Sequence, residues 1–240
     1  MTSDFMNKIN NKTVTVSTSS ELKEALEQNN GYEYIYLEND ITLNSGITIN
    51  SKKRKVTING TYQNTMHTLT GMNSSEATDT IISTALTKEV QMKNMKIINP
   101  NIYGTIYVPI DDSYDEIVTS YDNIIFNGTQ LSFNPYGTVK INNSNITIES
   151  TNGIESQEVC EAERIIIGGK TNITSSSPNL PLFSFRSDSV NPAVIFLCKS
   201  DITISTDTRE FMSGTNKLNF TILHDTKVHL TTGNGFSSMT

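Results

Sequence analysis

The second half of the chain repeats one short unit, and this repeat restricts the possible folds more than any other feature of the sequence. In each unit an apolar strand is followed by a tight polar turn, a Ser or Thr, and a second strand of alternating polarity. The unit occurs as IIFNGTQLSF (124–133), VKINNSNITI (139–148), IIIGGKTNIT (165–174), IFLCKSDITI (195–204) and TILHDTKVHL (221–230), and a related segment, VTINGT, begins at residue 56. Strands this short cannot bury their apolar faces alone, so they need equivalent strands stacked above and below them.

The spacing of the units predicts a parallel β-helix, an all-β solenoid. The Ser or Thr of each unit, taken as a register mark, falls at Thr129, Ser144, Thr171, Ser200 and Thr226, with steps of 15, 27, 29 and 26 residues. Three of the steps match one coil with a variable loop, whereas the first step is too short for a full coil. Because equivalent positions of successive coils lie about 4.8 Å apart, Asn127 is expected to stack on Asn142 as a ladder of side-chain amides. The apolar positions expected to form a narrow core are Ile125, Ile141, Ile166, Phe196 and Ile222.

The composition agrees with many short strands joined by polar turns. The chain has 27 Asn, 32 Thr, 26 Ser and 28 Ile among 240 residues. Thr and Ile favour pleated strands, and Asn and Ser favour turns. The Asn-Gly pairs at 59–60 and 127–128 could also form hairpin turns, so a β-sandwich or meander is the alternative fold.

The N-terminal part combines one strand with one helix. Residues 13–16 (TVTV) alternate as a strand does, and Thr18-Ser19-Ser20-Glu21 has the spacing of a capping box. Leu22, Ala25 and Leu26 then form one apolar face, and Asn29-Asn30-Gly31 ends the helix. Such a helix would cover the open end of a solenoid. We therefore expect one domain over 1–240, with strand and capping helix at 13–31 and stacked coils at 32–240, either whole or as a piece of a longer protein.

The N-terminal segment resembles the pectate-lyase-like right-handed β-helix family, in particular its adhesive branch in surface proteins of Gram-positive bacteria. The resemblance lies in the order of a strand, a capped helix with ELKEAL, then YIYLENDITL, GITI and KKRKVTINGT, and it covers residues 14–61. It implies a right-handed solenoid displayed at the cell surface or outside the cell, with a role in attachment rather than turnover.

Charge and apolar patterning exclude several kinds of partner. The formal net charge of −7 argues against nucleic acid, and the basic run at 52–55 is expected to be a solvated turn. The chain contains no apolar stretch long enough for a membrane span and no charged-then-apolar leader, so we expect no membrane insertion. Only Cys160 and Cys198 occur, so a single bridge between them stays open.

We expect no catalytic residue, no cofactor and no metal site, because the titratable residues do not occur at the spacing that such sites need. Glu158, Glu161 and Glu163 surround Cys160, and Arg186 and Asp188 are expected to form an exposed ion pair. The acidic run is the best metal candidate but lacks the order of a calcium loop, and we expect solvated charge there: Asp111, Asp112, Asp115 and Glu116. The three histidines, His67, His224 and His229, are too scattered for a zinc site.

Four tyrosines gather around the acidic run, in the segment 103–122: Tyr103, Tyr107, Tyr114 and Tyr121. They either pack this loop onto the solenoid wall or form an exposed patch for a carbohydrate or protein ligand. The leading hypothesis is a non-catalytic adhesion module that binds a glycan or protein, with self-association through the C-terminal coil as a further possibility. The alternatives are a lyase acting on acidic polysaccharide near residues 103–122, and a fibre segment that trimerises.

Overall fold

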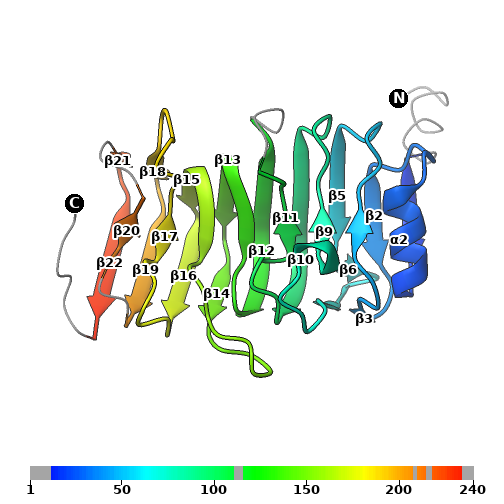
Figure 1. Ribbon diagram of the computed structural model, residues 1–240, viewed down its shortest axis with the longest axis horizontal. Helices are drawn as coiled ribbons and strands as arrows, with labels where there is room; N and C mark the ends of the chain where they lie inside the picture. The colour runs from blue at the N-terminus through cyan, green and yellow to red at the C-terminus, as the bar shows by residue number, and fades with distance from the viewer. Residues whose placement is uncertain (1–11, 111–115, 208–209, 215–217, 234–240) are drawn as a thin grey trace.

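The computed structural model of the protein describes residues 12–110, 116–207, 210–214 and 218–233. The described chain winds into a parallel β-solenoid of about seven turns, with one helix at its N-terminal end and strand β22 at the other end (Figure 1). The described strand pairs of the solenoid are parallel, and each joins equivalent segments of adjacent coils. The predicted parallel β-helix with a single N-terminal helix is confirmed.

The strands form three parallel faces, which we call A, B and C. Face A contains β1 (Thr13–Val16), β2 (Tyr34–Leu37), β5 (Lys55–Asn59), the first halves of β10 (Glu89–Asn99) and β12 (Val118–Gly128), the second halves of β13 (Ser132–Asn142) and β15 (Cys160–Gly168), β18 (Ala193–Phe196) and β21 (Asn219–Ile222). Face B contains β3 (Ile41–Thr42), β8 (Thr68–Thr70), the second halves of β10 and β12, β14 (Asn145–Ile148), β16 (Lys170–Ser175), β19 (Asp201–Thr206) and β22 (Lys227–Thr232). Face C contains β4 (Ile47–Thr48), β9 (Ile81–Ile82), β11 (Ile106–Tyr107), the first halves of β13 and β15, β17 (Phe183–Ser184) and β20 (Met212–Ser213).

The corner between faces A and B explains the Asn-rich turns of the repeat. In six coils one residue at this corner has a left-handed backbone, with φ between 51° and 60°: Asn94, Asn123, Asn143, Gly169, Lys199 and Asp225. Asn and Gly tolerate this conformation better than other residues. The register marks Ser144, Ser200 and Thr226 directly follow this corner residue, so they do mark one place in the coil.

The short first step of the repeat arose because Thr129 marks a different corner. Thr129 follows Gly128 at the end of face B, where its hydroxyl donates to the Asn101 carbonyl at 2.7 Å. The position equivalent to Asn143 is Asn123, so the true step between these two coils is longer than the one counted from Thr129. A Cβ at residue 128 would collide with the backbone of Asn99, so this Gly permits the close approach of two coils instead of forming a hairpin turn.

The buried core differs from the predicted one at two positions, Ile125 on face B and Ile166 on face A. The register aligns Tyr121, Ile141, Ile167 and Phe196, and all four are at most 1% exposed. The prediction was wrong for Ile125, which is 46% exposed, and for Ile166, which faces outward beside Ile167. Strand residues alternate between faces, so a shift of one residue moves a side chain from the core to the surface. Ile222 continues the buried row but is exposed, because no described coil covers it.

The predicted amide ladder between Asn127 and Asn142 is also wrong, since these residues lie on different faces. Asn127 is on face B, where its amide donates to Glu149 at 2.6 Å. Asn142 ends face A, and its amide donates to Asp122 at 2.8 Å. Amide stacking occurs elsewhere on face B, where Asn172 donates to Asn145 at 2.8 Å.

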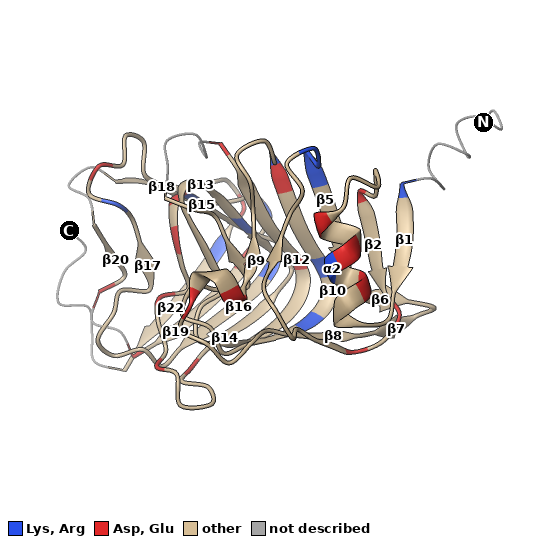
Figure 2. Ribbon diagram, turned by 45° about the vertical axis from the view of Figure 1, so that its right-hand side comes forward, with Lys and Arg blue, Asp and Glu red and all other residues tan. Residues whose placement is uncertain are grey.

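The helix α2 (Ser19–Glu27) covers the first coils as predicted. Thr18 and Glu21 form a complete capping box, which satisfies backbone donors at the start of the helix. The apolar face of Leu22, Ala25 and Leu26 is buried against the solenoid. The outer side carries mainly acidic residues, as Figure 2 shows.

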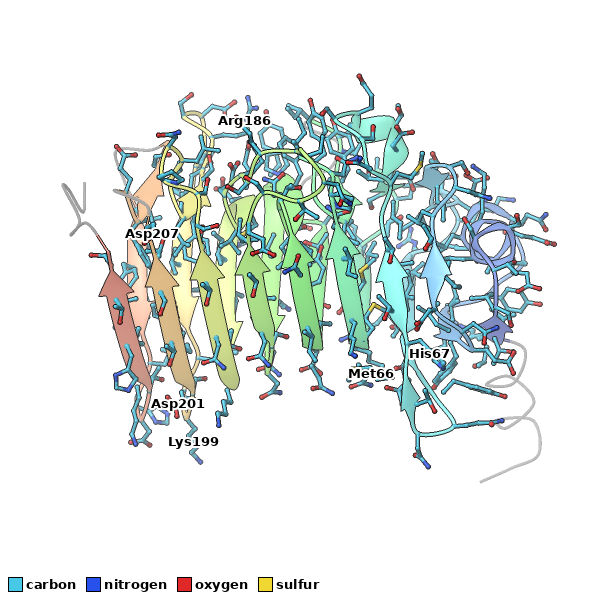
Figure 3. All side chains as sticks on the ribbon, turned by 90° about the horizontal axis from the view of Figure 1, so that it is seen from below. Met66, His67, Arg186, Lys199, Asp201 and Asp207 are labelled. Atoms are coloured by element: carbon cyan, nitrogen blue, oxygen red, sulfur yellow. The ribbon has the colours of Figure 1, made fainter. Side chains whose placement is uncertain are left out.

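Two local features depart from a plain solenoid. An antiparallel hairpin of β6 (Thr61–Tyr62) and β7 (Thr65–Met66) projects from the first coils beside face B (Figure 3), and its turn has left-handed backbone at Gln63 and Asn64. A short 3-10 helix, η1 (Ala77–Asp79), precedes β9. The hairpin turn considered at Asn59-Gly60 therefore lies further along the chain, at Gln63-Asn64.

The basic run 52–55 begins in an exposed turn, as predicted, and only Lys53 of its four residues is buried. Lys53 is 5% exposed, and its ammonium donates to Asn30 and to the carbonyl of Tyr32 at 2.7 and 2.9 Å. Lys55 pairs with Glu89 at 2.6 Å. Lys53 therefore joins the segment after the helix to the coils, whereas Lys52, Arg54 and Lys55 are exposed. Cys160 is buried and Cys198 is exposed, and both thiols are free.

The register predicts opposite results for two adjacent substitutions. Ile167→Ala should lower the free energy of unfolding by about 2 to 4 kcal/mol, because it opens a cavity in the core. Ile166→Ala should cost less than about 1 kcal/mol, because this side chain faces outward. Urea unfolding followed by circular dichroism measures both values. Equal losses would contradict the assigned register.

Candidate ligand-binding surface

A continuous row of outward side chains crosses four coils of face C. The register aligns Tyr107 of β11 with Phe133 of β13, Phe133 with Glu161 of β15, and Glu161 with Ser184 of β17. Each residue follows an inward neighbour in its short strand, because side chains alternate along a strand. We call this series the face C row. Aromatic rings, a carboxylate and a hydroxyl therefore follow one another along the solenoid axis.

Three aromatic rings pack together at the N-terminal end of this row. The rings of Tyr107 and Phe133 stack with their centroids 5.2 Å apart and an interplanar angle of 24°. Tyr103 meets both rings edge-on, at 5.4 Å from Tyr107 and 5.7 Å from Phe133. Both tyrosines are partly exposed, whereas Phe133 is 8% exposed. The cluster offers ring faces and phenol groups to the solvent, supported from below by Phe133.

The turn that carries Tyr103 is held from inside the solenoid. Asn101 is fully buried, and its side chain accepts from the backbone of Tyr103 at 2.9 Å and donates to the carbonyl of Glu76 at 3.0 Å. Gly104 follows with φ of 76°, and a Cβ there would lie 2.7 Å from the backbone nitrogen of Ser132. The sequence Asn-x-x-Gly thus seats the ring of Tyr103 against the wall.

Two carboxyl groups close to the rings have raised pKa values. Burial and the charge of Glu158 raise the pKa of Glu161 to about 7, against an opposing effect of Arg186. Burial likewise raises the pKa of Glu158. A carboxylate with a strong cationic partner would have a lowered pKa. The raised pKa values therefore show that nearby positive charge does not offset burial and, for Glu161, the repulsion by Glu158.

A polar assembly borders the row at the corner between faces C and A. The guanidinium of Arg186 donates to both carboxylate oxygens of Asp188 at 2.9 and 3.2 Å and lies 4.9 Å from the ring centre of Tyr136. The hydroxyl of Tyr136 also donates to Asp188 at 3.4 Å. The hydrogen bonds from Arg186 lower the pKa of Asp188. The structure contains the predicted ion pair of Arg186 and Asp188, with Tyr136 as an additional partner.

An open cavity of about 320 Å³ lies at the same corner. Its lining is mostly polar and consists of Glu116, Tyr136, Glu163, Arg164, Asp188, Ser189, Val190 and Asn191. Glu163 is held in place by the backbone of Asn191, which donates to it at 2.5 Å. The cavity therefore extends the polar surface beyond the row.

The structure brings together only part of the predicted tyrosine group. Tyr103 and Tyr107 meet on face C, but Tyr121 lies in the core, where its hydroxyl donates to the Leu131 carbonyl at 3.1 Å. Burial raises the pKa of Tyr121. Tyr114 and the candidates Asp111, Asp112 and Asp115 lie outside the described residues. Sequence reasoning missed Phe133 and Tyr136, because the alternation in QLSF predicts an inward Phe133, whereas the structure buries Ser132 and turns Phe133 outward.

No group of three or more His, Cys, Asp or Glu residues is placed to hold a metal ion within the described ranges. Of the histidines, His67 lies 3.6 Å from Asp40 and His224 lies 3.1 Å from Asp225. Each of these two thus has its own carboxylate partner, on different coils. The absence of a catalytic site stays a prediction.

The comparison with protein families decides what kind of protein this is. A profile of the pectate lyase-like adhesive domain matches residues 13–160, well over half of the chain. The chain belongs to this family. The resemblance seen in residues 14–61 is thereby confirmed, as is the predicted module for adhesion or ligand binding.

Two solved structures are similar to this adhesive domain. The SRRP of Lactobacillus reuteri 100-23 is 18% identical with a TM-score of 0.58, covering 91% of this chain and 75% of that one. The SRRP of L. reuteri 53608 is 14% identical with a TM-score of 0.41, covering 90% of this chain and 99% of that one. The first supports the fold. No curated protein matches the sequence.

Across the described residues, no helix has the length and apolar character of a membrane span.

The raised pKa of Glu161 predicts a stability that depends on pH. The folded state binds this proton more tightly than the unfolded state, so stability should fall as pH rises from about 4.5 to about 7. Glu161→Gln removes the ionisable carboxyl group and with it this loss of stability. The variant should gain up to about 3 kcal/mol relative to the parent chain at pH 8 and little at pH 4.

Urea unfolding at the two pH values measures this difference, with Glu155→Gln in the exposed neighbouring loop as the control. A gain for Glu161→Gln that is the same at both pH values would show that the carboxylate does not titrate as assigned.

Proposed function

We propose that this adhesive domain acts outside the cell or at its surface and binds its ligand on the outer wall of face C. The observation that carries the proposal is the cluster of Tyr103, Tyr107 and Phe133, which presents partly exposed rings beside carboxyl groups. Tyrosines are favoured in binding surfaces because they combine apolar area with a polar hydroxyl. The ligand is a carbohydrate or a protein group of matching size.

The proposed compartment rests on the family and the composition. An adhesive domain meets its target outside the cytoplasm, and a solenoid of similar fold is an SRRP of Lactobacillus reuteri. The low content of charged residues, 18%, and the wealth of Asn, Thr and Ser agree with this assignment. We assign the protein to the cell surface or the extracellular space on these grounds.

Self-association through the C-terminal coil stays a prediction. In the final described coil Phe220, Ile222 and Leu230 are 44%, 51% and 37% exposed. Any coil or second chain that stacks on β21 and β22 would bury these side chains. The mass of the protein in solution tests this separately from ligand binding.

Removal of the exposed rings should weaken adhesion without affecting the fold. Beads coated with the Tyr103→Ala, Tyr107→Ala double variant should bind to mucin layers and to bacterial wall polysaccharide at least about fivefold less than beads with the parent chain. The matched control is the double variant Tyr34→Ala, Tyr36→Ala, which removes two tyrosines from face A near the helix. Equal retention of both variants would contradict the proposed site, and release of unsaturated uronides from polygalacturonate would contradict a non-catalytic role.

A further inference from the structure

We infer that the ligand of the face C surface is a neutral glycan chain lying along the solenoid axis, and that uronic acid polymers are excluded. This inference rests on the proposed function and assigns a chemical class to its ligand. It uses three properties of the surface: its charge, the direction of the face C row, and the cavity at its border.

The charge around the row opposes an acidic ligand. The described side chains bordering it include five carboxyl groups and three cationic groups: Glu116, Glu158, Glu161, Glu163 and Asp188 against Lys88, Arg164 and Arg186, with Lys88 at 3.8 Å from Glu116. Arg186 already donates to both oxygens of Asp188, so the two side chains form an ion pair with no net charge to attract an acidic ligand. A uronide placed here would bring like charges together, which is unfavourable.

The same groups suit a ligand that carries hydroxyls and no charge. Carboxylates accept charge-assisted hydrogen bonds from hydroxyl donors, and a buried carboxylate gains from such donors. Glu161 lies in the row between Phe133 and Ser184, and burial and the charge of Glu158 disfavour its ionised form, so hydrogen-bond donors there would stabilise it. Sugar hydroxyls would supply donors at this position.

The direction of the row suits a chain rather than a single sugar. Tyr107, Phe133, Glu161 and Ser184 follow one another at the spacing of adjacent coils, about 4.8 Å. An extended glycan parallel to the axis would place one ring against Tyr103 and Tyr107 and carry its hydroxyls over Glu161 and Ser184. The apolar face of a pyranose ring provides the surface that an aromatic ring can stack on.

The cavity offers room for a branch or an end of that chain. Its volume of about 320 Å³ accommodates one sugar ring, and its lining supplies hydroxyl, amide and carboxylate partners. The ring of Tyr136 forms one side and is held by Arg186. A surface of rings and acceptors that ends in a polar cavity suits a neutral oligosaccharide.

The test compares neutral and acidic polymers on the same protein. Immobilised β-galactan, α-mannan, β-glucan and N-acetylglucosamine oligomers are the neutral probes, and polygalacturonate with and without Ca²⁺ is the acidic probe, all at pH 7.5. At least one neutral polymer should bind about tenfold or more tightly than polygalacturonate. That binding should fall about tenfold in the Tyr103→Ala, Tyr107→Ala variant and persist in the Tyr34→Ala, Tyr36→Ala control.

A charge variant tests the cause of the selectivity. Glu161→Gln should raise the binding of polygalacturonate several-fold while leaving neutral binding equal or weaker, because it removes a repelling charge and replaces a carboxylate acceptor by a weaker amide acceptor. Polygalacturonate that binds as tightly as the best neutral probe, with or without Ca²⁺, would overturn the inference. No binding of any neutral probe would overturn it as well.

These outcomes are separable from failure of the proposed function. If adhesion depends on Tyr103 and Tyr107 but the bound polymer is acidic or the target is a protein, the site stands and the assigned ligand class is wrong. If adhesion does not depend on these two rings, the proposed site itself is wrong.

Discussion

Every feature of this protein depends on the parallel pairing of one coil with the next. Backbone hydrogen bonds of each strand are satisfied by the coils on either side, so the chain needs no wide sheet to shield its edges. The pairing also fixes the register, and the register decides which side chains turn inward. Ile167 and Ile166 are adjacent in sequence, yet the first is in the core and the second on the surface.

This arrangement separates stability from recognition. The inward row of Tyr121, Ile141, Ile167 and Phe196 holds the coils together, whereas outward positions can vary without disturbing the stack. On face C the strands are as short as two residues, so each coil displays few outward side chains there. A binding surface on this face is built by aligning one residue from each coil. Chemically different groups, such as Phe133 and Glu161, therefore become neighbours although they lie far apart in the sequence.

The repeat and the helix could be predicted from the sequence because they rest on local signals. The capping box at Thr18 and Glu21 and the apolar stripe from Leu22 to Leu26 depend on neighbouring residues only, and both are present in the structure. Parallel stacking followed from strands too short to be stable alone.

The register could not be predicted in the same way, because it depends on which corner each turn forms. Thr129 and Ser144 look alike in sequence but occupy different corners, and this error placed Ile125 in the core. Tyr121 was grouped with Tyr103 and Tyr107 by distance along the chain, although the alternation of β12 turns it inward. The cavity at the corner of faces C and A joins four separate segments, and no local pattern marks it.

Binding of the ligand to face C can be tested by observing the tyrosine rings directly. The chain contains nine tyrosines and no tryptophan, so ring-labelled tyrosine yields few NMR signals, each assignable by a Tyr→Phe variant. An oligosaccharide from the neutral polymer that binds the protein is then titrated in. Binding on face C predicts shifts at Tyr103 and Tyr107 and none at Tyr34 and Tyr36. Shifts only at the face A tyrosines, or no shift at any of the nine tyrosines, would contradict binding on face C.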